Sequence, residues 1–413
     1  MDTDLLPAAA STRWLPSDRR GLLRDLERPR DVWANLTPNW FASVMGTGIV
    51  AVAAASLPEQ FPGLRVAATV VWALALAMLV ALGVLTALHW LHHPATARGH
   101  ASDAVMSHFY GAVPMAMLTV GAGTLLLGRD WIGARAAVDV DWVLWFAGTA
   151  GGLVCAAAIP YLLFTRHETK PDSAFGGWLM PIVPPMVSAS TGALLIPYAQ
   201  QGQERLTLLV CCYAMFGLSL LPSIVIITLI WFRLAVHKVG PARMVPTLWI
   251  VLGPLGQSVT AANLLGGNAR LALPAPYVGA FEAFGVVYGL PVLGFALLWA
   301  AIATAVTVRT ALDGLPFSLT WWSFTFPIGT CVTGATGVAG HTGSEPLRIA
   351  AGLSYVVLVG AWALVAVRTV RCAYRGRLFL PAAVRPATAR PATAHPGTAR
   401  PTDNSRIGAH GHA

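Results

Sequence analysis

Charged side chains are scarce in this 413-residue chain. They make up 11% of the residues, while 56% of the residues are hydrophobic and the mean hydropathy is +0.63. Soluble globular domains contain about 25% charged residues. The composition therefore excludes a soluble globular fold for most of the chain and predicts an all-α integral membrane protein that crosses the bilayer many times.

Acidic residues are nearly absent from the predicted membrane segments. Asp103, Asp141 and Glu282 lie near the ends of their segments, and no Lys or Arg lies in the middle of one. Cation channels and proton-coupled carriers usually keep acidic residues within the membrane, because a charge there is costly and is retained for function. The scarcity of carboxylates argues against cation transport.

Cysteine is also rare, and catalytic motifs are missing. The five cysteines, four of them in apolar segments, include no C-x-x-C pair, which argues against a disulfide framework or a zinc site. The sequence has no nucleophile-base pair, Walker loop or dinucleotide motif, so we predict neither an enzyme nor a resident cofactor or metal. The first 35 residues hold six Arg and no continuous apolar core, unlike a cleavable signal peptide.

Apolar runs of membrane-spanning length recur along the chain. Each is long enough to cross about 30 Å of hydrocarbon at about 1.5 Å per residue. The ten runs cover residues 38–57, 64–91, 103–127, 141–165, 178–199, 206–232, 247–266, 278–308, 319–340 and 346–369. Because most connections are short, we expect consecutive helices to pair as five antiparallel hairpins.

The composition changes at both ends of this region. We expect a membrane domain at 36–375, between a basic N-terminal tail at 1–35 and a basic, Pro/Ala-rich tail at 376–413. The second tail contains repeated RPATA-like pentads, which cannot bury a core and are predicted to be disordered.

Positive charge is distributed unevenly among the loops. With the N-terminus in the cytoplasm, 21 of the 27 Lys and Arg lie on the inner side. This bias follows the positive-inside rule and predicts a multi-pass plasma-membrane protein with both termini in the cytoplasm. The formal charge of +9 is explained by topology, and no basic stretch interleaved with aromatics indicates nucleic-acid binding.

Every second span carries an aromatic residue followed five or six positions later by a helix breaker. The pairs are Phe41 and Gly46, Phe109 and Pro114, Trp178 and Pro184, Trp249 and Pro254, and Trp322 and Pro327. In lipid, freed backbone groups survive only against neighbouring helices or a water-filled cavity. The same spans hold eighteen Ser and Thr, against twelve in the other spans. We predict that the odd-numbered helices surround a central pore; ordinary packing of small residues between helices is the alternative.

The polar groups expected in this pore suit an anion. Hydroxyls, side-chain amides and N–H groups freed at the breaks can replace part of an anion's hydration shell. With both termini inside, the odd helices also point their positive N-terminal ends at the cytoplasmic mouth. The residues expected to line the pore or its kinks are Phe41, Gly46, Thr47, Gly48, Phe109, Pro114, Pro184, Ser188, Pro254, Gln257, Ser258, Phe324, Pro327 and Thr330.

Histidines gather near the cytoplasmic end of the second and third spans. His89, His92, His93, His100 and His108 have a spacing that could ligate haem, which gives an alternative function as a membrane-embedded redox subunit. Most of them fall in the connecting loop and no span has a central histidine, so we prefer transport.

Five segments carry a family resemblance. They read PNWFASVMGTGIV at 38–50, then HFYGAVPMAMLTVG, PIVPPMVSASTGALL, LGPLGQSVTAANLLG and WWSFTFPIGTCVTG. In these segments the chain resembles the tellurite-resistance/dicarboxylate transporter family, which includes bacterial TehA, plant slow anion channels, fungal malate carriers and sulfite efflux pumps. The resemblance covers about residues 36–375. It implies a homotrimer of ten-helix protomers, each with its own pore.

The resemblance also implies a substrate class and a gate. Family members transport small anions: C4-dicarboxylates such as malate, sulfite, or chloride and nitrate. They close the pore with a phenylalanine beside the kink of the ninth helix. The matching residue here is Phe326, directly before Pro327, with Phe324 as a neighbouring candidate.

Overall fold

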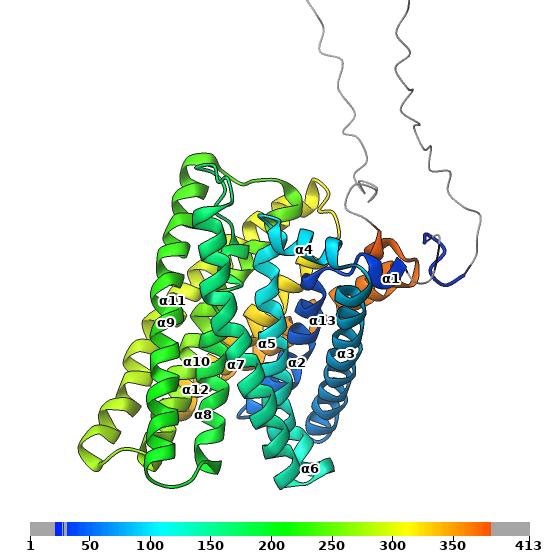
Figure 1. The fold of residues 1–413 in the computed structure, drawn as a ribbon. Helices are drawn as coiled ribbons and strands as arrows, with labels where there is room; N and C mark the ends of the chain where they lie inside the picture. The colour runs from blue at the N-terminus through cyan, green and yellow to red at the C-terminus, as the bar shows by residue number, and fades with distance from the viewer. Residues whose placement is uncertain (1–20, 27, 29–30, 381–413) are drawn as a thin grey trace, which may run out of the picture.

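A computed structural model of the chain describes residues 21–26, 28 and 31–380 (Figure 1). Within these residues the regular secondary structure is helical, with no strand. The all-α prediction is confirmed. The predicted tail beyond residue 380 lies outside the described residues, as do the first 20 residues.

Eight helical segments of the described residues are long and apolar enough to cross a membrane. They are Pro38–Ser56, Leu64–His92, Met106–Ile132, Ala134–Thr165, Gln203–His237, Ala242–Leu271, Ala275–Leu312 and Glu345–Tyr374. The other expected spans are interrupted. Residues 180–183 separate η4 (Gly176–Leu179) from α8 (Pro184–Leu195), and Thr325 separates η8 (Leu319–Phe324) from α12 (Phe326–Thr342).

Several expected kinks are junctions between a 3-10 helix and an α-helix. Thus η2 (Met106–Gly111) leads into α5 (Ala112–Gly123), η6 (Ala242–Val251) into α10 (Leu252–Asn268), and η8 into α12. The aromatic residue lies in the 3-10 segment and the proline in the first turn of the α-helix, where its missing N–H breaks no helical hydrogen bond. Gly46 differs, because it lies inside α2 (Phe41–Ser56), which starts directly after η1 (Pro38–Trp40).

Burial divides the long helices into two layers. In the spans that contain α2, α5 and α10, 83–89% of the most apolar 18-residue stretch is buried. In α3 (Leu64–His92), α7 (Ala134–Thr165), α9 (Gln203–His237), α11 (Ala275–Leu312) and α13 (Glu345–Tyr374) the share is only 17–33%. Helices α8 and α12 are also buried along most of their length.

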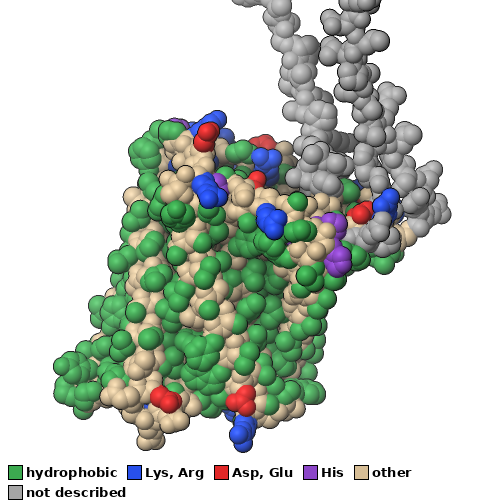
Figure 2. Space-filling model, viewed as in Figure 1, with side chains coloured by type: hydrophobic (Ala, Val, Ile, Leu, Met, Phe, Trp, Pro, Cys, Tyr) green, Lys and Arg blue, Asp and Glu red, His purple; other side chains and the backbone are tan. Residues whose placement is uncertain are grey.

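The buried helices form a closed ring. Helix α2 contacts α5, α5 contacts α8, α8 contacts α10, α10 contacts α12, and α12 contacts α2. Each outer helix packs on the inner helix that precedes it in the chain. Figure 2 shows the resulting surface, with hydrophobic sides and charged side chains at the two ends, as a lipid-facing layer requires.

Small residues let the inner helices approach closely. A Cβ atom on Gly256 of α10 would lie 2.5 Å from the backbone nitrogen of Cys331 on α12. Beside this contact, the hydroxyls of Thr260 and Thr333 form a hydrogen bond of 2.7 Å between the same helices. The contact between α10 and α12 therefore depends on glycine and paired hydroxyls, as is usual for membrane helices.

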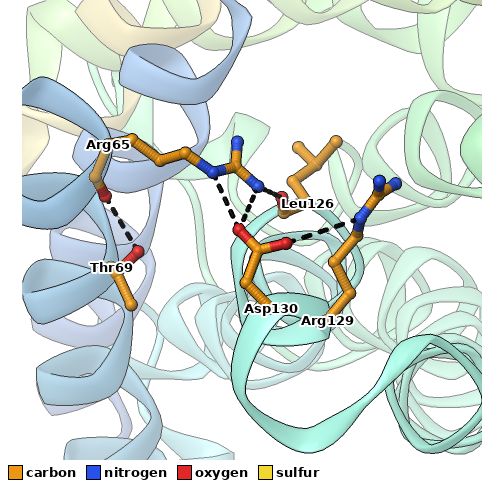
Figure 3. A network of polar contacts seen from close by, with 5 residues as sticks. All are labelled: Arg65, Thr69, Leu126, Arg129 and Asp130. Carbon is orange, nitrogen blue, oxygen red and sulfur yellow. Dashed lines mark hydrogen bonds and ion pairs between the residues drawn. The ribbon is translucent and has the colours of Figure 1, made fainter.

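A polar network fastens α3 to the two short segments that follow α5, which are η3 (Thr124–Gly128) and α6 (Arg129–Ile132) (Figure 3). Arg65 donates from Nε to Asp130 at 2.8 Å and from Nη2 to the carbonyl oxygen of Leu126 at 3.0 Å. Leu126 lies in a π-helical segment, η3 (Thr124–Gly128), and Trp72 donates its indole N–H to Thr124 at 3.2 Å. An exposed ion pair is worth about 0–1 kcal/mol, so this network fixes geometry more than it stabilises the fold.

The two ends of the described chain meet at one end of the bundle. The backbone N–H of Leu23 donates to the Tyr374 carbonyl at 2.7 Å, and Arg377 pairs with Asp25 at 3.0 Å. Trp40 stacks on Phe379 with ring centroids 5.1 Å apart. Figure 1 shows α1 (Asp31–Ala34) and the C-terminal end of the described chain at the same end of the bundle as α4 (Pro94–Ser102).

Candidate functional site

A small cavity lies inside the ring of inner helices, and all five inner segments contribute to its wall. The space open to a water-sized sphere is about 20 Å³, enough for about one water molecule. The lining residues are Ala42, Met45, Phe109, Met115, Met180, Val183, Ile250, Gly253, Leu319, Trp322, Ser323, Phe326 and Pro327. The ring therefore encloses a narrow central space that the side chains nearly fill. We call it the central cavity.

The wall of the central cavity is almost entirely apolar. Among the described residues that line it, Ser323 carries the one side-chain hydroxyl. A constriction of this kind offers an ion no substitute for its hydration shell, so it blocks passage while it is narrow and dry.

Phe326 occupies the start of α12 at the wall of the central cavity. Its side chain is 2% exposed, and Pro327 follows it in the first turn of the helix. The preceding residue, Thr325, donates its hydroxyl to the Trp322 carbonyl at 2.7 Å and accepts from the N–H of Gly329 at 3.0 Å. Phe326 is thus the first residue of α12, directly after the Thr325 junction with η8.

Phe324 lies elsewhere. It is partly buried and packs against Trp249 and Trp321, with ring centroids 5.6 and 5.7 Å away. It does not line the central cavity, so the two neighbouring phenylalanines have different surroundings.

The other predicted aromatic residues also separate. Phe109 in η2 is 3% exposed and lines the central cavity together with Phe326. Phe41 is equally buried but faces a groove formed with residues of α3, α5 and α7. Pro114 and Pro184 also face α7: their Cβ atoms lie 3.7 and 2.8 Å from Cβ positions built on Gly151 and Gly152 of that helix.

Several predicted hydroxyls face neighbouring helices. Thr47 accepts a hydrogen bond of 3.1 Å from the Trp362 indole on α13, and Ser258 accepts one of 2.8 Å from the Tyr288 hydroxyl on α11. Ser188 donates to the Pro184 carbonyl at 3.2 Å within α8. None of these hydroxyls lines the central cavity among the described residues.

The remaining predicted residues lie at contacts inside the ring. Gln257 donates to Ser190 of α8, and Thr330 donates to the Pro327 carbonyl at 2.7 Å. Pro254 is buried in the first turn of α10. Cβ atoms on Gly46 and Gly48 would lie 2.8 Å from Trp322 and from Thr119, so both glycines permit close approach to α2.

Sequence reasoning missed the methionines of the central cavity. Met45, Met115 and Met180 come from three different inner segments, and each lies next to an expected breaker or a few residues before it. Their position close to the expected helix breaks is visible in the sequence and could have identified them. The sequence interpretation considered polar side chains as the pore lining and therefore did not include these methionines.

The histidines form stacks. His89 lies 5.4 Å from His100 and 6.4 Å from His93 between ring centroids, while His108 packs separately against Phe175 and Trp178 at 5.7 and 6.4 Å. The described residues contain no group of three or more His, Cys, Asp or Glu arranged to hold a metal ion. The haem alternative is not favoured.

Comparison with known proteins gives a consistent family. The model of the voltage-dependent anion channel family matches residues 35–370. The chain is 30% identical to the sulfite efflux pump of Trichophyton rubrum, over 85% of this chain and 95% of that protein. It is 26% identical to an uncharacterized transporter of Methanocaldococcus jannaschii, over 84% and 97%, and 20% identical to the malic acid transport protein of Schizosaccharomyces pombe, over 82% and 78%.

Proposed function

Since this chain belongs to the voltage-dependent anion channel family, we propose that it carries small anions across the plasma membrane through the ring of inner helices. In this proposal ten helices cross the bilayer as five hairpins, with both termini in the cytoplasm. The membrane domain is 36–375, flanked by cytoplasmic tails at 1–35 and 376–413. The bundle assembles as a homotrimer with one path in each subunit.

One observation supports the path above all others. Five inner segments close a ring, and each contributes side chains to the central cavity. Ordinary helix packing would explain buried small residues, but it would not require one cavity to touch every inner segment. Together with the lack of carboxylates in the predicted span centres, this arrangement supports a neutral path for anions.

The gate in this proposal is Phe326. It is buried at the wall of the central cavity and is the first residue of α12, next to Thr325, which separates α12 from η8. A small rotation of this junction would move the ring and widen the space. Phe109 lines the same space from η2, so the open state also requires room beside Phe109.

Sulfite is the first substrate to test. The relative from Trichophyton rubrum is named a sulfite efflux pump and spans nearly the same length. Malate is the second, because the Schizosaccharomyces pombe relative is named a malic acid transport protein. Chloride and nitrate are tested as well, because they are small anions that a path without cationic side chains can carry.

The experiment is a flux screen with the purified full-length protein in proteoliposomes. Sulfite, malate, chloride, nitrate and tellurite are loaded separately, and efflux is compared with empty liposomes. Sulfite efflux above the other anions would support the proposal in its specific form. Absence of efflux for every anion, with correctly folded protein in the membrane, would refute it.

A further inference from the structure

A second cavity, distinct from the central cavity, lies at the ends of α7 and α9. It has a volume of about 230 Å³ and is walled by the segment after α7, η4, the last turn of α9 and η6. We call it the α7–α9 cavity. Its volume is below the roughly 300–1,000 Å³ of pockets for drug-sized ligands, so it suits a small head group.

Three charged side chains line this cavity, and none has an ion-pair or hydrogen-bond partner among the residues that the structure describes. Arg233 on α9 is one of them, and its Nε atom is shielded from solvent. Glu168 and Asp172, in the segment after α7, line the same cavity from its exposed edge and also form no ion pair or hydrogen bond. Opposite charges therefore share one cavity without pairing to each other.

The shielded Nε–H of Arg233 is destabilising, because no protein hydrogen bond replaces the one that it would make to water. A phosphate or carboxylate placed against Arg233 would accept a charge-assisted hydrogen bond from this group. A primary ammonium placed at Glu168 and Asp172 would satisfy the two carboxylates. A ligand with both groups would bridge the charges that the protein leaves apart.

The rest of the wall selects a lipid over a free metabolite. Leu163, Leu234, Met244 and Leu248 give the cavity a mainly apolar surface. It also lies where two lipid-facing helices end, which is the depth of phospholipid head groups. By the positive-inside distribution of charge, this end faces the cytoplasm.

We propose that the α7–α9 cavity binds the head group of an ethanolamine phospholipid. Its phosphate contacts Arg233, its ammonium contacts Glu168 and Asp172, and its glycerol and acyl region lies along the apolar wall. A choline lipid is a poorer ligand, because its trimethylated nitrogen donates no hydrogen bond. An anionic lipid without an amine leaves the carboxylates unpaired.

The bound lipid would touch segments that lead into the ring. Trp178 of η4 lines the cavity and stacks on His108 of η2, and Thr247 and Leu248 of η6 line it too. These segments precede α8, α5 and α10. The lipid would therefore brace three of the five inner helices, and this effect on transport rests on the proposed function above.

Binding can be measured without transport. Full-length protein in detergent is titrated with ethanolamine, choline and glycerol phospholipids of equal chain length, and the complexes are counted by native mass spectrometry alongside thermal unfolding. We expect the ethanolamine lipid to bind at least about tenfold more tightly than the choline lipid, since charge-assisted hydrogen bonds are lost in the latter. Soluble phosphoethanolamine is titrated in parallel.

Variants assign the contacts. Arg233→Gln should weaken all the phospholipids, and the double variant Glu168→Gln/Asp172→Asn should remove only the preference for ethanolamine. Arg309→Gln, an exposed arginine near the end of α11, is the matched control and should bind as the native protein does. The double variant changes exposed side chains, so it tests the proposal even where Arg233→Gln fails to fold.

Three results would overturn the proposal. The first is equal binding of the lipids by the native protein, and the second is an undiminished ethanolamine preference in the double variant. The third is binding of soluble phosphoethanolamine as tight as that of the lipid, which would assign the cavity to a metabolite. Each is independent of whether any anion crosses the membrane, so a failed flux screen and a failed lipid site can be told apart.

Discussion

Replacing Phe326 by alanine should raise anion flux per folded protein by at least about tenfold. The side chain of Phe326 is 2% exposed, and the central cavity that it borders has a volume of about 20 Å³. The phenyl group is therefore packed against the cavity wall and is not surrounded by bulk water. An ion that loses hydration pays several kcal/mol. Removing only about 1.4 kcal/mol of this barrier gives a tenfold higher rate.

The same substitution should also destabilise the protein. Truncation of a buried phenylalanine costs about 3–5 kcal/mol, so the amount of folded protein falls while each molecule conducts better. Flux must therefore be divided by folded protein, measured by size-exclusion chromatography of the reconstituted sample. Stopped-flow efflux from proteoliposomes gives the rate.

Phe324→Ala is the matched control. It removes the same ring two residues away, but from a contact with Trp249 and Trp321 outside the central cavity. We expect unchanged flux per folded molecule. If flux rises in Phe324→Ala but does not rise in Phe326→Ala, the gate is Phe324. If flux is unchanged in both variants, Phe326 is a packing residue.

Three further predictions concern selectivity, packing and the tail. Under a salt gradient the reversal potential should follow the anion, and a potential that follows potassium or protons would contradict a path without carboxylates. Gly46→Ala places a Cβ against the Thr325 hydroxyl and 2.8 Å from the Trp322 ring, so it should cost about 1–3 kcal/mol and lower both the thermal unfolding midpoint and the flux. Gly83→Ala, inside α3 with nothing within 4 Å of its Cβ, should lower neither, because alanine is the better helix former. Deletion of residues 381–413 should leave flux nearly unchanged, because the central cavity is built from residues between 42 and 327; loss of flux with normal membrane insertion would show a direct role for the tail.

The alternation of inner and outer helices could be predicted from the sequence because helix-breaking residues recur in every second span. A proline or an aromatic-to-breaker pair is visible without coordinates, and lipid tolerates such breaks only where protein surrounds them. The distinction between Phe326 and Phe324 was only partly accessible. The family motif favoured Phe326, but the packing of Phe324 against Trp249 depends on where η6 lies beside η8.

The direction of the hydroxyls could not be predicted. An inner helix such as α2 is buried on nearly all faces, so no polar stripe separates the face toward the cavity from the faces toward neighbours. The position of Thr47 in the sequence does not distinguish the pore from α13. In the structure Thr47 accepts a hydrogen bond from Trp362 of α13 and does not line the central cavity. Similarly, a proline in an apolar run predicts a break but not whether the break is a kink or the first turn of an α-helix.

The closed ring sets an order on biosynthesis. Its last contact joins α12 to α2, so the first inner helix waits in the bilayer until almost the whole domain has left the ribosome. Until that contact forms, the ring is open between α2 and α12, and the faces that will border the central cavity are not fully enclosed by protein. Because they carry methionine, phenylalanine and small side chains in place of charge, the unfinished ring can wait in hydrocarbon at little cost. The apolar wall that closes the finished path thus also makes the protein easier to assemble.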